Sequence, residues 1–241
     1  MREVFKGFAL AVSMLTTLPF FKVHEFTKGI NGYAVMAYPL VGFLLGALLY
    51  GIYVLLTPFV PAFHLGIVIF ALWVYLTGAL HLDGFCDTVD GLYVPKERAL
   101  EVMKDPHNGG MGMIFGGVFL LLKASSLAVF DMFYLLPIVL LLPRLAVVFS
   151  IYAYAYVSPN GMSTLAKEEL KLWQVGVAFA YSLLLSVLFK TFFLLLLTFV
   201  VLFVIKRFFI KRYGGFTGDI YGFSIEVIEL VVLNAIILGL A

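Results

Sequence analysis

The acidic residues of one short segment have a spacing that could hold a divalent cation. The segment runs His81-Leu-Asp-Gly-Phe-Cys-Asp-Thr-Val-Asp-Gly91 and carries Asp83, Asp87 and Asp90 at positions i, i+4 and i+7. On a helix these three side chains share one face, because each residue turns the helix by about 100°. No lysine at helical spacing within the segment neutralises them, so a bound cation is the simplest stabiliser.

The donor types indicate which cation this segment would bind. Oxygen ligands select a hard ion, so we expect Mg²⁺, with Mn²⁺ as the alternative, before zinc. His81, Cys86 and His107 do not have the spacing of a zinc set. The competing interpretation is a solvated acidic helix end, but acidic clusters at a membrane are costly and usually functional.

A second acidic group begins with Asp219, the last residue of the sequence Gly214-Gly-Phe-Thr-Gly-Asp219. Asp219, Glu226 and Glu229 have spacings that allow one helix face to hold all three. The two glutamates fall inside an apolar run, so they must face the protein interior or a wet cavity. The alternative is a structural ion pair with Lys123 or Arg144, which also lie in apolar runs.

A third segment, Met103-Lys-Asp-Pro-His-Asn-Gly-Gly-Met-Gly112, has glycines just before an expected helix. Backbone N–H groups at such a helix start can hold phosphate. Lys104 could add positive charge there, and Asp105 could bind a metal. Glycines also occur commonly in loops just before a helix, so this motif alone is weak evidence for a phosphate site.

The composition says where these segments must lie. The chain has 241 residues, of which 63% are hydrophobic and 12% charged, and a mean hydropathy of +1.08. A soluble domain is about half apolar and about a quarter charged. The excess apolar surface needs a lipid bilayer, and we expect an all-α polytopic membrane helix bundle forming a single catalytic domain over residues 1–241. The net charge of +2 implies no nucleic-acid partner.

Hydrophobic runs give the expected helices. They are Phe5–Phe20, Tyr33–Thr57, Ala62–Leu80, Met111–Phe130, Met132–Val157, Leu172–Phe189, Thr191–Ile205 and Tyr221–Leu240. Lys190 separates the two arms of a tight hairpin. The first run follows Arg2 and Lys6 as a signal peptide would, but it carries Glu3 and lacks a small-x-small cleavage site, so we expect it to be retained.

The basic residues set the orientation. If the first run lies in the interface or re-enters and the other seven span, nearly all of the 16 basic residues fall on one side. Lys190 alone falls on the other, and Lys123 and Arg144 lie within runs. We therefore expect about seven transmembrane helices plus an N-terminal interfacial or re-entrant helix, with the N-terminus and the acidic motifs on the cytoplasmic side of the cell membrane.

The three motifs together resemble the cobalamin synthase family, also called adenosylcobinamide-GDP ribazoletransferase. The matching elements are His-Leu-Asp-Gly-x-x-Asp-Thr-x-Asp-Gly at 81–91, Met-Lys-Asp at 103–105, and Gly-Gly-x-Thr-Gly-Asp with two glutamates at 214–229. Tyr38-Pro-Leu-Val-Gly42 and Leu-Thr-x-Leu-Pro at 15–19 are also similar. The resemblance departs at Thr17, where arginine is expected, and at Pro106-His107, where Ser-Arg is expected.

The resemblance implies the last step of nucleotide-loop assembly in cobalamin biosynthesis. A ribose hydroxyl of α-ribazole, or of its 5′-phosphate, attacks the cobinamide-bearing phosphorus of adenosylcobinamide-GDP. GMP leaves, and adenosylcobalamin or its 5′-phosphate forms. The family is membrane-bound and Mg²⁺-dependent.

The acidic residues and the motifs that match the family together give our hypothesis for the roles of individual residues. The expected catalytic and metal-binding set is Asp83, Asp87, Asp90, Asp219 and Glu226. The expected substrate-binding set is His81, Lys104, Asp105, Gly109, Thr217 and Glu229. Asp90 is the candidate for the base that takes the hydroxyl proton. The oligomeric state, including a homo-oligomer, stays open.

Two rival functions compete with this interpretation. A Mg²⁺-dependent membrane phosphotransferase of the CDP-alcohol type also uses spaced aspartates, but its Asp-Gly-x-x-Ala-Arg is absent, since Phe85-Cys-Asp-Thr88 follows Asp83-Gly84. A cation-coupled transporter could line a path with intramembrane charges. No inverted repeat is evident, which argues against the common transporter plans.

Overall fold

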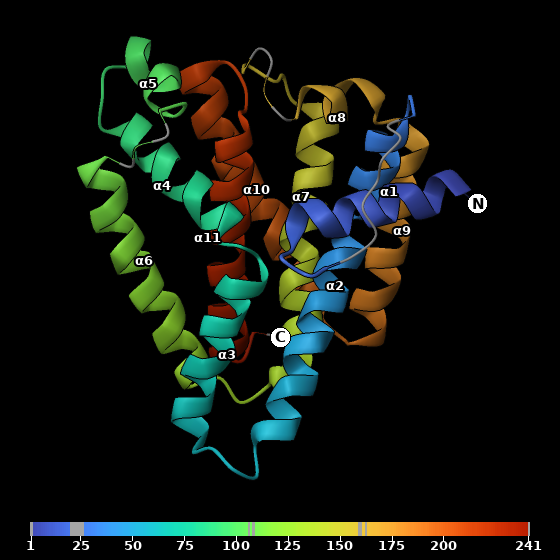
Figure 1. Ribbon diagram of the computed structural model, residues 1–241, viewed down its shortest axis with the longest axis vertical. Coiled ribbons are helices and arrows are strands. Elements are labelled where there is room, and N and C mark those ends of the chain that lie inside the picture. The colour runs from blue at the N-terminus through green and yellow to red at the C-terminus, as the bar shows by residue number, and fades with distance from the viewer. Residues whose placement is uncertain are drawn as a thin grey trace.

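The computed structural model describes residues 2–19, 27–105, 107, 109–158, 161 and 163–240. The helices, in chain order, are α1 (Arg2–Leu15), α2 (Ile30–Leu56), α3 (Ala62–Leu76), α4 (Leu80–Leu92), α5 (Lys96–Val102), α6 (Gly110–Ala128), α7 (Leu136–Ala153), α8 (Thr164–Glu169), α9 (Leu172–Leu188), α10 (Phe192–Tyr213) and α11 (Gly218–Ile237). A short 3₁₀ turn, Phe133–Leu135, precedes α7. The expected all-α bundle is confirmed (Figure 1).

Five helices are long and apolar enough to cross a membrane by themselves, within the described part of the chain. They are α2, α6, α7 with its preceding turn, α10 and α11. The pair α3 and α4 would make a sixth crossing, although it is bent by 83°. Helix α9 is apolar but has only 17 residues. Length and composition thus support five or six spans, and the expectation of about seven needs α9 as well.

Helix α7 lies at the centre of the bundle, and 89% of its best spanning window is buried inside the protein. Helix α2 packs closely against it because two glycines of α2 face the α7 backbone. A Cβ atom at Gly42 would lie 2.4 Å from the carbonyl oxygen of Leu140, and one at Gly46 would lie 2.4 Å from that of Leu136. Small residues at such contacts let membrane helices approach closely.

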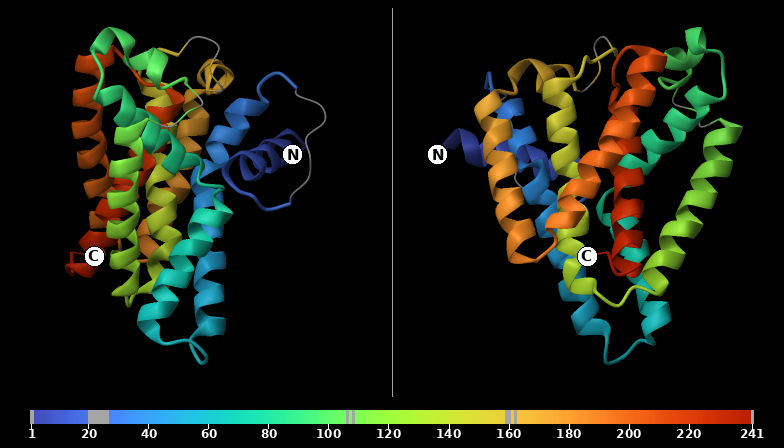
Figure 2. Two further views of the ribbon diagram at one scale, coloured as in Figure 1. Left: turned by 60° about the vertical axis from the view of Figure 1, so that its left-hand side comes forward. Right: turned by 180° about the vertical axis from the view of Figure 1, so that it is seen from behind.

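Helix α1 has 14 residues and is not among the helices that could span. It runs across the direction of the long helices and packs on α2 (Figures 1 and 2). Its placement agrees with an interfacial helix. Lys22, one of the 16 basic residues on which the expected orientation depends, lies outside the described residues.

Three segments differ from the expected runs. The run Ala62–Leu80 breaks at Gly78 and Ala79, whose φ angles are 60° and 54°, and the chain turns there into α4. The expected run Thr191–Ile205 ends too early, because the helix α10 continues to Tyr213. The expected hairpin at Lys190 is present, with φ 59° at that residue.

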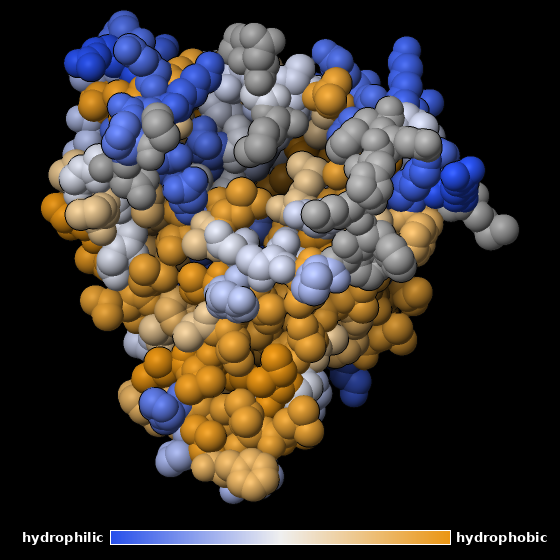
Figure 3. Space-filling model, viewed as in Figure 1, coloured by the Kyte–Doolittle hydropathy of each residue, from blue (hydrophilic) through white to orange (hydrophobic). Residues whose placement is uncertain are grey.

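Hydrophobic and hydrophilic residues separate along the long axis (Figure 3). Orange side chains cover the middle and much of the lower part of the face shown, and blue ones gather at the end that carries α5 and α8. An apolar belt with a polar cap is the pattern of a protein embedded in a bilayer. The acidic helix α4 and the start of α11 lie toward the polar end (Figure 1).

Candidate active site

A cavity of about 460 Å³ opens between two groups of helices. Helices α1, α2 and α7 form one wall, and α4 and α11 form the other. The chain after α5 and the segment after α7 complete its lining. The lining residues that could do chemistry are His81, Asp83, Lys104, Tyr156, Ser158, Ser163, Asp219 and Tyr221.

Helices α4 and α11 approach closely because each has a glycine at the crossing. A Cβ atom at Gly84 would lie 2.9 Å from the carbonyl oxygen of Asp219. One at Gly222 would lie 3.0 Å from the carbonyl oxygen of His81. This contact brings the two acidic motifs, which are far apart in the sequence, to one end of the cavity.

The start of α11 is fixed by a side-chain cap. The Oγ1 atom of Thr217 accepts a hydrogen bond from the backbone N–H of Ile220 at 3.2 Å. The same hydroxyl donates to Oδ2 of Asp219 at 3.2 Å. Thr217, predicted to bind substrate, therefore orients a carboxylate in the first turn, where the helix dipole favours negative charge.

Asp83, Asp87 and Asp219 form a set of like charges. Asp83 is exposed, whereas Asp87 and Asp219 are partly buried. Asp87 experiences repulsion from Asp83, Asp219 and also Asp90. The positive charge of Lys104, which also lines the cavity, acts on Asp219 from beyond ion-pair distance. No salt bridge joins these three aspartates to a cation in the described ranges, so their charge is available to a ligand.

The donor chemistry of this set fits Mg²⁺, because all of its ligands are carboxylate oxygens. Within the part of the chain that the structure describes, no three His, Cys, Asp or Glu side chains lie close enough to hold a metal by themselves. Mg²⁺ is usually bound by one or two carboxylates together with substrate phosphates. The arrangement is therefore compatible with an ion that needs a phosphate to complete its ligands.

Asp90 has a different environment from its two neighbours on α4. Its side chain is buried and accepts hydrogen bonds from the backbone N–H groups of Gly109, at 2.8 Å, and Gly112, at 2.7 Å. Both glycines are required, since a Cβ atom at either would come within 2.4 Å of the carboxylate. Asp90 thus ties the end of α4 to the start of α6. Its roles as metal ligand and base stay predictions.

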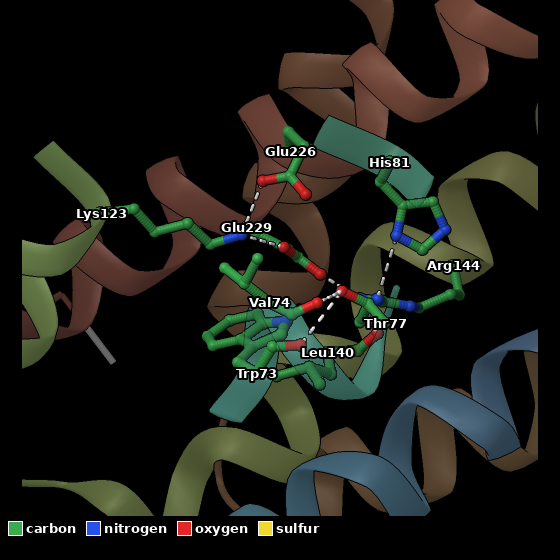
Figure 4. A network of polar contacts seen from close by, with 9 residues as sticks. All are labelled: Trp73, Val74, Thr77, His81, Lys123, Leu140, Arg144, Glu226 and Glu229. Atoms are coloured by element: carbon green, nitrogen blue, oxygen red, sulfur yellow. Dashed lines mark hydrogen bonds and ion pairs between the residues drawn. The ribbon is translucent and has the colours of Figure 1, made fainter. Parts of the chain in front are cut away.

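Glu226 and Glu229 belong to a buried ion-pair network (Figure 4). Lys123 donates to Glu226 at 2.7 Å and also to Glu229, whose other oxygen accepts from Arg144. The ammonium of Lys123 lies 4.3 Å from the centroid of the Trp73 ring. The structural ion pair weighed from the sequence is present, and neither glutamate lines the cavity.

The network ends at the cavity. Arg144 also donates to the carbonyl oxygen of Leu140 at 3.0 Å, and its Nη2 lies 3.5 Å from Nδ1 of His81. His81 lines the cavity, as its predicted substrate-binding role requires. Glu226 as metal ligand and Glu229 as substrate-binding residue stay predictions.

Asp105 and Gly109, predicted to bind substrate, do not line the cavity. Asp105 is exposed and lies 2.8 Å from Nδ1 of His107. The backbone N–H of His107, and then its ring, lower the pKa of the Asp105 carboxyl. Pro106, the other residue that departs from the family pattern, lies outside the described residues.

Thr17, where the family pattern has arginine, fastens the chain after α1 to the end of α3. Its N–H donates to the carbonyl oxygen of Leu76 at 2.8 Å, and its hydroxyl to that of Tyr75 at 3.2 Å. Sequence reasoning missed Tyr156 and Tyr221, which line the cavity. In a chain with 13 tyrosines, no spacing singles these two out.

Comparisons with known proteins agree on one family. The family model described as cobalamin-5-phosphate synthase matches residues 7–237. An adenosylcobinamide-GDP ribazoletransferase of Thermosynechococcus vestitus is 39% identical over 84% of this chain and 85% of its own length. A protein of the same name from Pseudomonas aeruginosa is 34% identical over 99% of this chain and 100% of its own length.

A third such relative, from Desulforamulus reducens, is 35% identical over 98% of each chain. No solved structure matches the chain. Because the family model and these relatives cover nearly the whole sequence, this chain belongs to the cobalamin-5-phosphate synthase family.

Proposed function

We propose that this protein transfers the adenosylcobinamide phosphate group of adenosylcobinamide-GDP to α-ribazole, or to its 5′-phosphate, and releases GMP. The observation that carries the proposal is the match to relatives of that name over almost the whole chain. The cavity lined by Asp83, Asp219 and Lys104 supports it, since charged groups of both signs suit a pyrophosphate and an attacking hydroxyl.

The reaction exchanges one phosphorus–oxygen bond for another. The ribose hydroxyl oxygen of the nucleoside forms a bond to the cobinamide-bearing phosphorus. The bond from that phosphorus to the oxygen of GMP breaks, and GMP leaves with the electron pair. The hydroxyl proton goes to a cavity-lining carboxylate, Asp83 or Asp219, because Asp90 already accepts two backbone N–H groups.

The remaining residues position and neutralise charge. Lys104 is exposed and lines the cavity, so its ammonium would neutralise charge on the leaving phosphate. Asp87 with one of Asp83 and Asp219 would hold Mg²⁺ or Mn²⁺, which would neutralise charge on the pyrophosphate. The other of these two carboxylates then takes the hydroxyl proton. Thr217 keeps the Asp219 carboxylate oriented toward the site.

The polar end of the molecule faces the cytoplasm in this proposal. The basic residues of the α4–α6 and α7–α9 connections lie at that end, as does the cavity (Figures 1 and 3). Positive loops stay on the cytoplasmic side of a membrane. Both nucleotide substrates are then supplied from the cytoplasm.

The test is direct turnover. The purified protein in mild detergent receives adenosylcobinamide-GDP, α-ribazole and Mg²⁺, with EDTA as the control, and GMP and the corrinoid product are separated by chromatography. We expect both products in equal amounts, and only with the divalent ion. Lack of turnover in a monodisperse, folded preparation would reject the proposed reaction.

A further inference from the structure

Two buried polar atoms of cavity-lining residues have no hydrogen-bond partner within the described residues. They are Nε2 of His81 and the hydroxyl of Tyr221. The exposed fractions of the two residues are only 4% and 5%. Buried polar atoms in folded proteins are nearly always paired, so two orphans on one cavity indicate groups that a ligand satisfies.

The contact with Arg144 defines which proton His81 carries. A guanidinium can only donate hydrogen bonds, so Nδ1 of His81, 3.5 Å from Nη2 of Arg144, must accept. The proton of the neutral ring then lies on Nε2, and that atom is a donor. Arg144 is itself held by Glu229 and Leu140, so the ring orientation is fixed by the buried network (Figure 4).

The opposite wall of the cavity is apolar. Met14 and Leu15 of α1, Tyr38 of α2, and Val147 and Ile151 of α7 line it. The α1, α2 and α7 wall is therefore mostly hydrocarbon, and the other wall adds hydrogen-bonding groups beside its own apolar Leu80 and Ile225. A ligand that matches both walls has a flat apolar ring system joined to a group rich in oxygen.

The size of the cavity separates the two substrates of the proposed reaction. Its volume of about 460 Å³ is in the range of small-molecule sites. A corrin ring with its peripheral amide side chains is much larger than a nucleoside, and guanine carries polar groups on every edge. The benzimidazole riboside α-ribazole has the two-sided character that the walls require.

We infer that this cavity is the acceptor-nucleoside subsite. The apolar base lies against the α1, α2 and α7 wall. Oxygens of the sugar accept from Nε2–H of His81 and bond the hydroxyl of Tyr221. The attacking hydroxyl then lies beside Asp83 and Asp219. The inference rests on the proposed function, because it takes its nucleoside from that reaction.

Three substitutions test the two polar contacts. Tyr221→Phe removes only a hydroxyl. His81→Asn can keep an acceptor for Arg144 but removes the donor at Nε2, whereas His81→Gln can place an N–H near the Nε2 position. The matched control is Ser182→Ala, which removes another buried, unpartnered hydroxyl from α9, away from the cavity.

Binding of α-ribazole alone is measured by calorimetry in lipid nanodiscs, and the KM of each substrate by turnover. We expect Tyr221→Phe and His81→Asn each to raise the Kd and KM for α-ribazole about tenfold, the loss of one hydrogen bond. His81→Gln should recover part of that loss, and Ser182→Ala should bind as wild type. The KM for adenosylcobinamide-GDP should not change, and guanosine should not compete.

Folded Tyr221→Phe and His81→Asn proteins that bind α-ribazole like wild type would overturn the subsite. A KM change confined to adenosylcobinamide-GDP would also overturn the subsite. In both cases, turnover by the wild-type protein would still support the proposed function. Wild-type protein that binds α-ribazole through His81 and Tyr221 but releases no GMP would support the subsite and reject the reaction. Wild type that neither binds α-ribazole nor turns over would reject both.

Discussion

Two groups of acidic residues lie close together on α4 and α11 but differ in how their charge is balanced. Glu226 and Glu229 are buried and paired with Lys123 and Arg144. Asp83 and Asp219, near the polar end, line a cavity and have no such cation. The first arrangement satisfies the requirement of the membrane interior for neutral pairs, and the second leaves charge for a ligand.

The comparison teaches that residue type alone does not separate structure from chemistry in this bundle. A carboxylate whose oxygens are all accepted by protein donors can stabilise the fold but has little capacity left for a metal. A carboxylate that faces other carboxylates destabilises the ligand-free protein by repulsion. Binding of a cation relieves that repulsion, so the same carboxylate stabilises the cation-bound protein. Substitutions in the two groups should therefore affect different measurements.

The largest effect is expected from Glu229→Gln. It leaves Lys123 and Arg144 with one carboxylate fewer in a site where Glu229 is fully buried. Removing one partner of a buried pair costs about 3–5 kcal/mol of folding free energy. Reversible unfolding in mixed micelles measures it, with exposed Glu101→Gln as the control. A loss below about 1 kcal/mol would contradict the structural role of the network.

Asp87→Asn should give the opposite result. We expect Mg²⁺-dependent turnover to fall about a hundredfold, equivalent to about 2.7 kcal/mol of transition-state stabilisation. Folding stability should stay constant or rise, because repulsion by Asp83 and Asp219 is reduced. Turnover and the unfolding midpoint are measured on one preparation. Near-normal turnover with Mg²⁺ would remove Asp87 from the metal site.

Asp90→Asn tests an aspartate that belongs to the acidic motif of α4 but is buried and bonded to backbone N–H groups. An amide can accept only through its oxygen, so one of the N–H groups of Gly109 and Gly112 loses its acceptor. The expected cost is about 1–3 kcal/mol of stability. Faster hydrogen exchange at those two amides would locate the loss. If stability is unchanged while turnover falls as far as in Asp87→Asn, Asp90 is catalytic rather than structural.

The smallest effect is expected at exposed Asp105. The folded state lowers the pKa of its carboxyl through the backbone N–H and then the ring of His107. That contact is present above the ordinary pKa of aspartate and is lost as pH falls through the lowered value. In His107→Ala the NMR midpoint should rise only part of the way, since the backbone N–H remains. Asp105→Asn should leave the thermal midpoint unchanged.

The sequence predicted the features that follow from periodicity and polarity. The spacing of Asp83 and Asp87 placed them on one helix face, and Lys190 marked the α9–α10 turn. Hydropathy did not predict the bend after α3, because residues 62–80 are continuously apolar while the bend depends on backbone angles at Gly78 and Ala79. It also ended α10 too early, since a helix can continue beyond the hydrocarbon layer to Tyr213.

Contacts between distant segments could not be predicted in this way. Asp90 meets Gly109 and Gly112 across a segment of 19 to 22 residues that includes α5, and no local pattern marks the pairing. Lys123 and Arg144 were named as alternative partners for the glutamates. That both of them bind Glu229 at once follows only from the three-dimensional structure. The cavity is lined by five helices and by the chain after α5 and after α7, and only the fold brings them together.

The buried network has a consequence for biosynthesis. During translation Lys123 and Arg144 emerge well before their shared partner, because Glu229 follows them by 106 and 85 residues. Until the last helix inserts, two cations lie in apolar segments without their shared carboxylate, which is a costly state for the incomplete bundle.

Arrival of α11 ends that state and, in the same event, delivers Asp219 and Tyr221 to the cavity. Completion of the fold and completion of the site thus depend on the insertion of the same helix. A chain truncated before α11 would carry two cations in apolar segments with no carboxylate to neutralise them, so it would lose stability and the site together.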